Sequence, residues 1–202
     1  IGNKDVPSTG VGQDWTPQTA PSKSGSLDKA KRYKEAAWTI MVPGTFIAGS
    51  ADHTVSIADT LTGNHAVCAT GLVVKIAKAN YLPDASGNSP GRTDVTAQFT
   101  IDVDAAPGAK DISVTITPKD VAAFDPEQYY YVSYRTCLTE DRVPDNTEVF
   151  ANSASLNGRP PVTASVRGPE FKSGKSGQLN TTERDVAGEK QPAGTTLDWK
   201  VE

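Results

Sequence analysis

Residues 148–156 read Glu-Val-Phe-Ala-Asn-Ser-Ala-Ser-Leu, and larger apolar side chains alternate with smaller or polar ones along this stretch. A hydrophobic pattern with a period of two is typical of a β-strand that buries one face. The pattern places the carboxamide of Asn152 on the buried face, in register with Phe150 and Leu156. The stretch therefore predicts a late β-strand that carries a polar side chain into an apolar core.

Further stretches of the chain show β-strand patterns, and they are separated by turns rich in Gly, Pro, Asn and Asp. The predicted strands are 36–42, 53–59, a segment around 71–76 within 68–78, 95–103, 111–117, 128–138 and 161–166. We expect a loop over 82–91 and a short helical turn over 120–125. Because no long amphipathic helix is present, the sequence predicts an all-β fold, an antiparallel immunoglobulin-like β-sandwich.

Composition and charge agree with this fold and exclude several classes of partner. Only 37% of the 202 residues are hydrophobic, and the chain contains 17 glycines and 14 prolines. A net charge of −4 gives no basic surface for nucleic acid or for an anionic membrane, and no apolar run could span a bilayer. Because the chain begins at Ile1, we interpret it as an excised or mature fragment.

A short pattern occurs twice in the chain. Residues 23–28 read Lys-Ser-Gly-Ser-Leu-Asp, and residues 175–180 read Lys-Ser-Gly-Gln-Leu-Asn. A tryptophan strand follows each copy, at Trp38 and at Trp199. Internal repetition indicates tandem modules. The predicted organisation is a linker or arm at 1–20, an immunoglobulin-like domain at 21–167, and a linker with the first strands of a following module at 168–202.

The two cysteines, Cys68 and Cys137, both fall in predicted strands. An even cysteine count in an extracellular-looking β-protein favours one disulfide formed in an oxidising compartment. Two buried free thiols are the alternative.

Two earlier stretches could bring reactive partners to Asn152. Residues 21–25 contain Lys23, and residues 55–61 contain Asp59 in an alternating strand. Burial lowers the pKa of a lysine and raises that of an aspartic acid, so the neutral amine could attack the asparagine Cγ while the acid donates a proton. The product would be a Lys–Asn isopeptide bond, formed once and without a cofactor or metal.

Ordinary roles remain open for each of these residues. Lysine is usually a solvated surface residue, and Lys29, Lys31 and Lys34 compete with Lys23 as the nucleophile. Asp59 could instead cap a turn, and Asn152 could be a structural amide.

The order of these motifs resembles that of a known family. The motifs are Lys23-Ser24-Gly25, Trp38-Thr39-Ile40, Asp59-Thr60-Leu61, Tyr131-Val132-Ser133-Tyr134-Arg135-Thr136 and Phe150-Ala151-Asn152-Ser153-Ala154. Over residues 20–167 the chain resembles the CnaA-type, collagen-adhesin-like immunoglobulin-like isopeptide domains of Gram-positive surface adhesins and pilins. The resemblance implies Lys23 as nucleophile, Asp59 as proton shuttle and Asn152 as acceptor, with Lys175 as the matching lysine of the next module.

The resemblance further implies a non-enzymatic stalk module, extracellular and attached to a bacterial cell wall, whose partners are neighbouring modules of the same surface protein. The first alternative is a ligand-binding adhesion domain for a host matrix protein or glycan. The second is an accessory sandwich of a secreted carbohydrate-active enzyme.

Three other groups of residues contain side chains that occur in catalytic, metal or ligand sites. His53 and His65 lack a nucleophile-elbow motif, so a Ser-His-Asp triad is not expected. Asp102 and Asp104 share one strand face and are a candidate for calcium binding, or they belong to a polar outer face. The tyrosines at 129, 130, 131 and 134 could form a ligand platform, or they could divide between the core and the surface.

Overall fold

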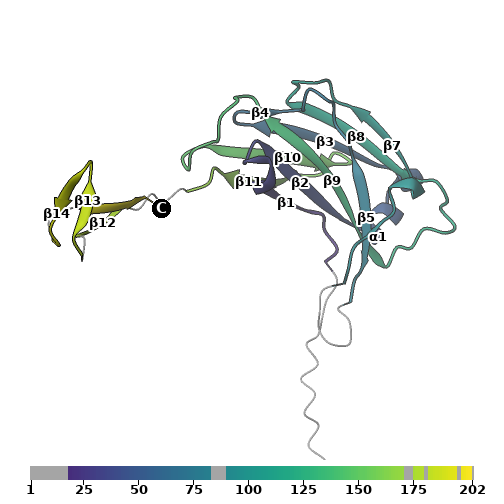
Figure 1. Cartoon of the computed structure of the whole chain (residues 1–202). Helices are drawn as coiled ribbons and strands as arrows, with labels where there is room; N and C mark the ends of the chain where they lie inside the picture. The colour runs from purple at the N-terminus through teal and green to yellow at the C-terminus, as the bar shows by residue number, and fades with distance from the viewer. Residues whose placement is uncertain (1–17, 83–89, 171–174, 180–181, 195–196, 202) are drawn as a thin grey trace, which may run out of the picture. The chain divides into compact units, whose positions relative to one another are not determined.

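The computed structural model describes residues 18–82, 90–170, 175–179, 182–194 and 197–201. The chain separates into two compact units, Ile1–Gly168 and Pro169–Glu202. The larger unit consists of two antiparallel β-sheets (Figure 1).

The first sheet contains β1 and β2 at one edge and has the order β1-β2-β9-β5-β6, while β4 also pairs with β9. The strands are β1 (Ser22–Leu27), β2 (Glu35–Pro43), β4 (His65–Ala66), β5 (Lys75–Asn80), β6 (Thr93–Asp94) and β9 (Gln128–Leu138). Buried and partly exposed positions alternate along β2 and β9, so Trp38, Ile40, Val132 and Tyr134 face inward. This alternation is the one expected for a sheet with one solvated face.

The second sheet has the order β11-β10-β3-β8-β7. The strands are β3 (Val55–Thr62), β7 (Phe99–Asp104), β8 (Asp111–Pro118), β10 (Val149–Leu156) and β11 (Val162–Arg167). The inward face of β3 consists of Val55, Ile57, Asp59 and Leu61, and every second residue of this strand is exposed. The Asp59 carboxyl group therefore lies on a strand face whose other side chains are all aliphatic.

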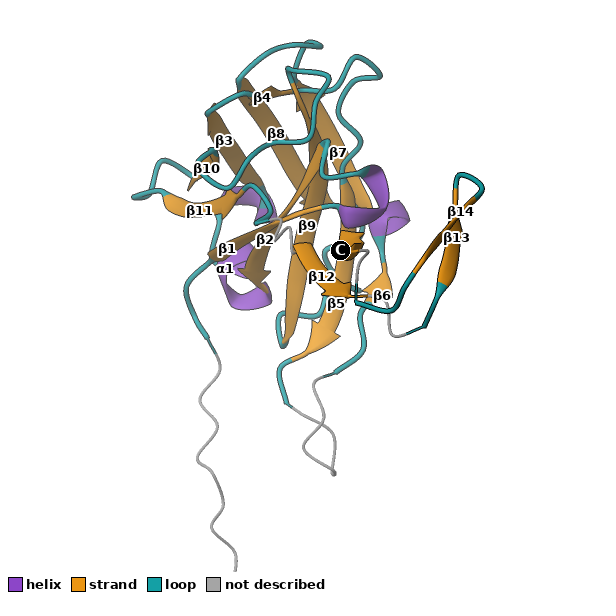
Figure 2. Ribbon diagram, turned by 60° about the vertical axis from the view of Figure 1, so that its left-hand side comes forward, coloured by secondary structure: helices purple, strands orange, loops and turns teal. Residues whose placement is uncertain are grey.

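The inward faces of both sheets contribute to one hydrophobic cluster, which includes Trp38, Ile57, Ile76 and Phe150. The helical segments are short (Figure 2): α1 (Gly44–Ala48) and the 3₁₀ turns Lys29–Lys31, Ala51–His53 and Thr96–Gln98. None of the described helices is long and apolar enough to cross a membrane. The predicted antiparallel β-sandwich is confirmed.

Three local predictions were wrong. The segment before Lys75 is not a strand, and Val73 is 69% exposed. The strand predicted over 95–103 begins only at Phe99, because Thr96 donates its backbone N–H to Asp94 Oδ1 and turns the chain. The helical turn predicted over 120–125 is a bend in which Asp120 Oδ1 accepts the backbone N–H groups of two following residues.

The smaller unit contains two antiparallel pairs of β-strands. Strand β12 (Lys175–Leu179) pairs with β15 (Leu197–Val201), and β13 (Arg184–Val186) pairs with β14 (Glu189–Gln191). Gly177 lies opposite Trp199 in the backbone register, as Gly25 lies opposite Trp38 in the β1–β2 pair. The predicted arm up to residue 17 and the side chain of Lys175 lie outside the described residues.

Candidate functional site

Lys23 reaches the core from the edge strand of the first sheet. It lies on β1 opposite Ile40, and its side chain is completely excluded from solvent. Its Nζ atom donates hydrogen bonds to Asp59 Oδ2 at 2.8 Å and to the Tyr134 hydroxyl at 2.9 Å. The two acceptors of the Lys23 Nζ atom therefore lie in opposite sheets, because Asp59 belongs to β3 and Tyr134 to β9.

Gly25 explains how β1 can approach the core so closely. It lies opposite Trp38, and a Cβ atom at position 25 would lie 2.3 Å from Trp38 Cζ3. Real Cβ atoms do not come so near to a ring carbon, so the indole occupies the space that any side chain would need. The Lys-Ser-Gly motif thus combines an inward lysine with the glycine that lets its strand dock.

Asp59 and Asn152 lie on the neighbouring strands β3 and β10 of the second sheet. Asp59 is opposite Ala154, and Asn152 is opposite Leu61, so the two polar residues are diagonal neighbours on the same inward face. Both are buried, with exposed fractions of 2% for Asp59 and 0% for Asn152. The Asn152 Nδ2 atom donates a hydrogen bond to the Tyr134 hydroxyl at 3.1 Å.

Tyr134 is the residue of this site whose role was not predicted from the sequence. Its hydroxyl accepts hydrogen bonds from both Lys23 Nζ and Asn152 Nδ2. Its inward position could be predicted from the alternation of β9, since it shares a face with Tyr130 and Val132. The structure therefore brings Lys23, Asp59 and Asn152 together around one phenol, with contributions from four strands.

Burial controls the protonation of this cluster. Removal from water lowers the pKa of Lys23 to about 8, although the nearby Asp59 carboxylate opposes that shift. Burial likewise raises the pKa of Asp59, against the opposing effects of Lys23 and the Asn152 side chain. Both shifts bring the neutral pair, amine and carboxylic acid, closer in free energy to the ion pair.

Two oxygens in the cluster lack hydrogen-bond donors. Within the described residues, Asp59 Oδ1 and Asn152 Oδ1 are buried and accept no hydrogen bond. An unsatisfied buried acceptor is costly, and a proton on the Asp59 carboxyl group would supply a donor in this region. The arrangement therefore suits a protonated Asp59 beside a carboxamide oxygen that gains negative charge when a nucleophile attacks.

His65 fixes the backbone beside Asn152. Its Nε2 atom lies 3.0 Å from the carbonyl oxygens of Thr62 and Ala151, so this nitrogen carries the proton. Its Nδ1 atom then accepts from the Thr136 hydroxyl, which itself accepts from Trp38 Nε1. Burial lowers the pKa of His65, which favours this neutral form. The histidine is structural, and it holds the peptide group that precedes Asn152.

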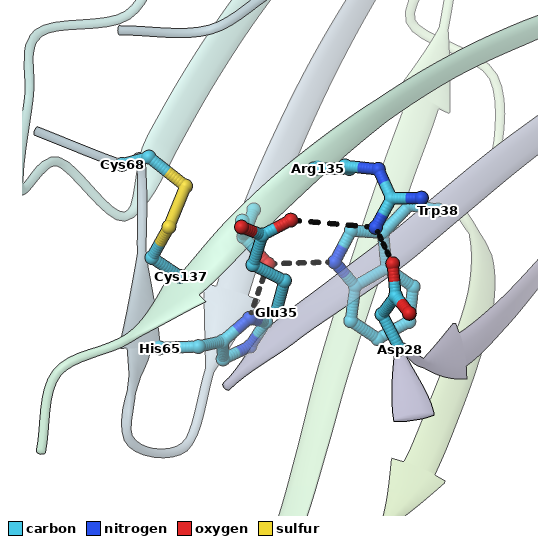
Figure 3. Close-up of a disulfide and its surroundings, with 8 residues drawn as sticks. Asp28, Glu35, Trp38, His65, Cys68, Arg135 and Cys137 are labelled. Carbon is cyan, nitrogen blue, oxygen red and sulfur yellow. Dashed lines mark hydrogen bonds and ion pairs between the residues drawn. A yellow bond between two sulfur atoms is a disulfide. The ribbon is translucent and has the colours of Figure 1, made fainter. Parts of the chain in front are cut away.

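The predicted disulfide between Cys68 and Cys137 is confirmed (Figure 3). Cys137 lies near the end of β9, whereas Cys68 lies in a turn after β4 and not in the strand predicted there. Arg135 in the same region donates hydrogen bonds to the carboxylates of Asp28 and Glu35 (Figure 3). The disulfide ties the turn after β4 to the central strand of the first sheet.

The alternative lysines and the candidate calcium ligands lie outside the Lys23–Asp59–Asn152 cluster. Lys29 and Lys31 are exposed on a 3₁₀ turn, and Lys34 forms an ion pair with the exposed carboxylate of Asp141. Asp102 and Asp104 are exposed on β7. No group of three or more His, Cys, Asp or Glu side chains in the described part of the chain could hold a metal ion.

The four tyrosines of β9 divide between the two faces of the sheet. Tyr130 and Tyr134 are buried, whereas Tyr129 and Tyr131 are partly exposed on the outer face. The four side chains therefore do not form one ligand platform, and the alternative prediction, a division between the core and the surface, is confirmed.

The chain was compared with known proteins. No family model matches it, and no curated protein matches it. Solved structures do match in fold. The collagen-binding domain of a Staphylococcus aureus adhesin is 13% identical with a TM-score of 0.45, and the match covers 76% of this chain and 100% of that domain.

Two further solved structures are similar. The collagen-binding subdomain of the Enterococcus faecalis surface protein ACE is 15% identical with a TM-score of 0.37, and the match covers 73% of this chain and 96% of that chain. The collagen-binding domain of the Erysipelothrix rhusiopathiae surface protein RspB is 14% identical with a TM-score of 0.42, over 92% of this chain and 49% of that chain. This chain thus spans about half of the RspB structure, and the three structures described here are collagen-binding domains of bacterial adhesins or surface proteins.

Proposed function

We propose that residues 21–167 form a structural module of a bacterial cell-surface adhesin, stabilised by an isopeptide bond that Lys23 and Asn152 form without an external catalyst. The observation that carries this proposal is the burial of an amine, a carboxyl group and a carboxamide in one cluster between the two sheets. An ordinary core would contain apolar side chains at these positions, because burial of three polar groups is costly.

The reaction begins with a proton transfer within the ion pair. Lys23 Nζ gives a proton to Asp59, and the neutral amine attacks Asn152 Cγ. The Asp59 acid donates its proton to the carboxamide oxygen and so stabilises the tetrahedral intermediate. A proton then moves from Nζ to Nδ2, ammonia leaves as the intermediate collapses, and the proton on oxygen returns to Asp59. The folded chain holds the reactants together, which can lower the barrier by ~7–11 kcal/mol.

The bond would stabilise the domain by topology. It would join β1 of one sheet to β10 of the other and close a loop of about 130 residues. Closing so long a loop restricts the unfolded chain and stabilises the fold by about 5 kcal/mol in the chain-entropy description. Because Lys23 and Asn152 lie near the two ends of the domain sequence, pulling forces would pass through the covalent bond.

The repeated Gly–Trp strand register supports a serial stalk. The β12–β15 pair has the same glycine-to-tryptophan register as the β1–β2 pair. We therefore infer that residues 168–202 belong to a following module in which Lys175 takes the position of Lys23. The proposed location is the outside of the cell, on the wall of a Gram-positive bacterium, with neighbouring modules as partners.

Intact mass tests the proposal after the disulfide has been reduced. The wild-type chain should be lighter than its sequence mass by one ammonia, and Lys23→Met and Asn152→Ala should each abolish that loss. Lys34→Met is the matched control, because Lys34 lies outside the cluster and this variant should still lose one ammonia. An unmodified wild-type mass would refute the isopeptide bond.

A groove on the outer face of the first sheet favours a second candidate function, ligand binding. A cavity of about 530 Å³ lies over β2, β5 and β9, beside the disulfide, and a second cavity of about 230 Å³ shares Thr39 with it. The volume of the first cavity is typical of small-molecule sites, which span about 300–1,000 Å³. Arg92 stacks on the ring of Tyr131 at 3.6 Å in the second cavity and provides a cationic aromatic wall.

Binding to immobilised matrix proteins, collagen among them, and to a glycan array tests this second candidate. Thr39→Arg should block a ligand that occupies the groove. Ser165→Arg, on the exposed face of β11 in the other sheet, should leave its binding unchanged. Equal binding by both variants would place the ligand elsewhere, and an absence of binding in every assay would leave the stalk role.

A further inference from the structure

We propose that Tyr134 is a catalytic residue of the cross-linking reaction, and that its hydroxyl relays a proton from Lys23 Nζ to the departing nitrogen of Asn152. This inference rests on the proposed function. It assigns a chemical role to a side chain that neither the sequence motifs nor the Lys–Asp–Asn cluster required.

The geometry of the hydroxyl carries the proposal. Tyr134 lies 2.9 Å from the nitrogen whose bond to carbon must form and 3.1 Å from the nitrogen whose bond to carbon must break. The residue is only 4% exposed, so bulk water has little access to these contacts. A phenol can accept a proton at oxygen while it donates its own, and its state is then unchanged.

The reaction needs such a relay at one step. After the attack, the intermediate carries an extra proton on Nζ, while Nδ2 must become ammonia before it can leave. Asp59 has given its proton to the carboxamide oxygen, and its Oδ2 atom is hydrogen-bonded to Nζ. The Tyr134 hydroxyl forms a hydrogen bond with each of the two nitrogens and can therefore connect them.

The atoms balance as follows. Nζ gives one proton to the Tyr134 oxygen, and the Tyr134 hydroxyl proton passes to Nδ2. The Cγ–Nδ2 bond then breaks with its electron pair on nitrogen, the carbonyl re-forms and its oxygen returns a proton to Asp59. Ammonia leaves and takes this proton as ammonium. The net change is lysine ammonium plus carboxamide to isopeptide plus ammonium, with Tyr134 and Asp59 restored.

Refolding kinetics of the full chain test the relay. The full chain is purified in denaturant from inclusion bodies, and its mass is checked to show that it has not reacted. It is then diluted into buffer to refold, samples are quenched in acid at intervals, and the intact mass of each is measured after reduction. Tyr134→Phe should slow ammonia loss by about 100-fold, since general acid–base groups contribute on this scale. Tyr130→Phe is the matched control, because Tyr130 is equally buried on β9 but donates to the Asp125 carbonyl, away from the cluster.

The outcomes separate this inference from the proposed function. A wild-type chain that never loses ammonia refutes the isopeptide bond and the relay with it. A wild-type chain that reacts, with Tyr134→Phe reacting at the same rate, refutes the relay alone. Near-ultraviolet circular dichroism after refolding establishes that Tyr134→Phe has folded before its rate is compared.

Site-specific fluorotyrosines at position 134 test the relay even if the phenylalanine variant folds poorly. Fluorine on the ring lowers the pKa of the phenol while the hydroxyl and its hydrogen bonds remain. If Tyr134 transfers a proton, the rate of ammonia loss should change progressively with the acidity of the phenol. A rate that stays constant across the series would mean that the hydroxyl only positions Lys23 and Asn152, and would overturn the relay.

Discussion

Lys23 Nζ lies 2.8 Å from Asp59 Oδ2, and both side chains are completely excluded from solvent although they belong to different sheets. The pair therefore forms a polar link through the middle of an apolar sandwich. A buried ion pair of this kind contributes little net stability, because desolvation of the charges offsets their attraction. Under the proposed function, the reactivity of the pair accounts for its presence better than its stability does.

Removal of one member of the pair should be worse than removal of both. Asp59→Leu leaves the Lys23 amine buried without its carboxylate, whereas the double variant Lys23→Met/Asp59→Leu removes both charges. We expect the free energy of unfolding of Asp59→Leu to be ~3–5 kcal/mol lower than that of the double variant. Urea unfolding measures the stability of both variants. Because neither variant can form the isopeptide bond, the difference between them reports on the buried pair alone. Equal stabilities would show that the pair is not buried in solution.

The rate of cross-linking should have a pH plateau. The ion pair and the reactive neutral pair carry the same number of protons, so pH does not change their ratio. Below the raised pKa of Asp59 the pair gains a proton and the amine remains ammonium, so the rate falls. Above the Lys23 pKa of about 8 the pair loses the proton that Asp59 must donate, so the rate falls again.

Refolding of unreacted chain at a series of pH values, followed by intact mass, measures this profile. A rate that instead keeps rising through pH values near 8 and then levels off would contradict the role of Asp59 as an acid. In that case deprotonation of Lys23 alone would control the reaction.

Gly25→Ala should weaken the docking of β1. The added methyl group would lie 2.3 Å from Trp38 Cζ3, and we expect a cost of ~1–3 kcal/mol together with slower ammonia loss. Gly91→Ala is the control, because nothing lies within 4 Å of its added Cβ atom. Thermal unfolding and refolding mass kinetics test both variants, and equal behaviour would contradict the close approach of β1 to the indole.

The disulfide should stabilise the domain independently of the isopeptide bond. Cys68 and Cys137 are 69 residues apart, and closure of a loop of this length corresponds to ~4 kcal/mol in the chain-entropy description. The Cys68→Ala/Cys137→Ala variant should therefore unfold at lower urea concentration, yet it should still lose one ammonia. If the cross-link fails to form in this variant, the disulfide instead organises the reactive cluster.

The sequence predicted the inward orientation of some site residues better than that of others. Alternation along β3 and β10 places Asp59 and Asn152 among the buried positions, as the structure confirms. Strand β1 reads Ser-Lys-Ser-Gly-Ser-Leu and has no apolar alternation, so only a family resemblance singled out Lys23. The position of Tyr134 follows from periodicity, but its two hydrogen bonds depend on long-range packing between the sheets.

The local hydrophobic pattern also misplaced the start of one strand. The run from Gly71 to Ile76 is apolar enough for a strand, yet pairing begins only at Lys75. The disulfide ties Cys68 to the end of β9, and the chain pairs with β9 again only at Lys75, opposite Ser133. A constraint of this kind, set by a partner 69 residues away, cannot be deduced from neighbouring residues.

Mass spectrometry of a tryptic digest tests the central claim most directly, because it identifies the residues that are joined. A bond between Lys23 and Asn152 blocks cleavage after Lys23, and it should produce one branched peptide containing residues 5–29 and 143–167, lighter than the sum of its parts by one ammonia. Fragmentation should place the branch at these two side chains. Recovery of two separate, unmodified peptides, 5–23 and 143–167, would contradict the account.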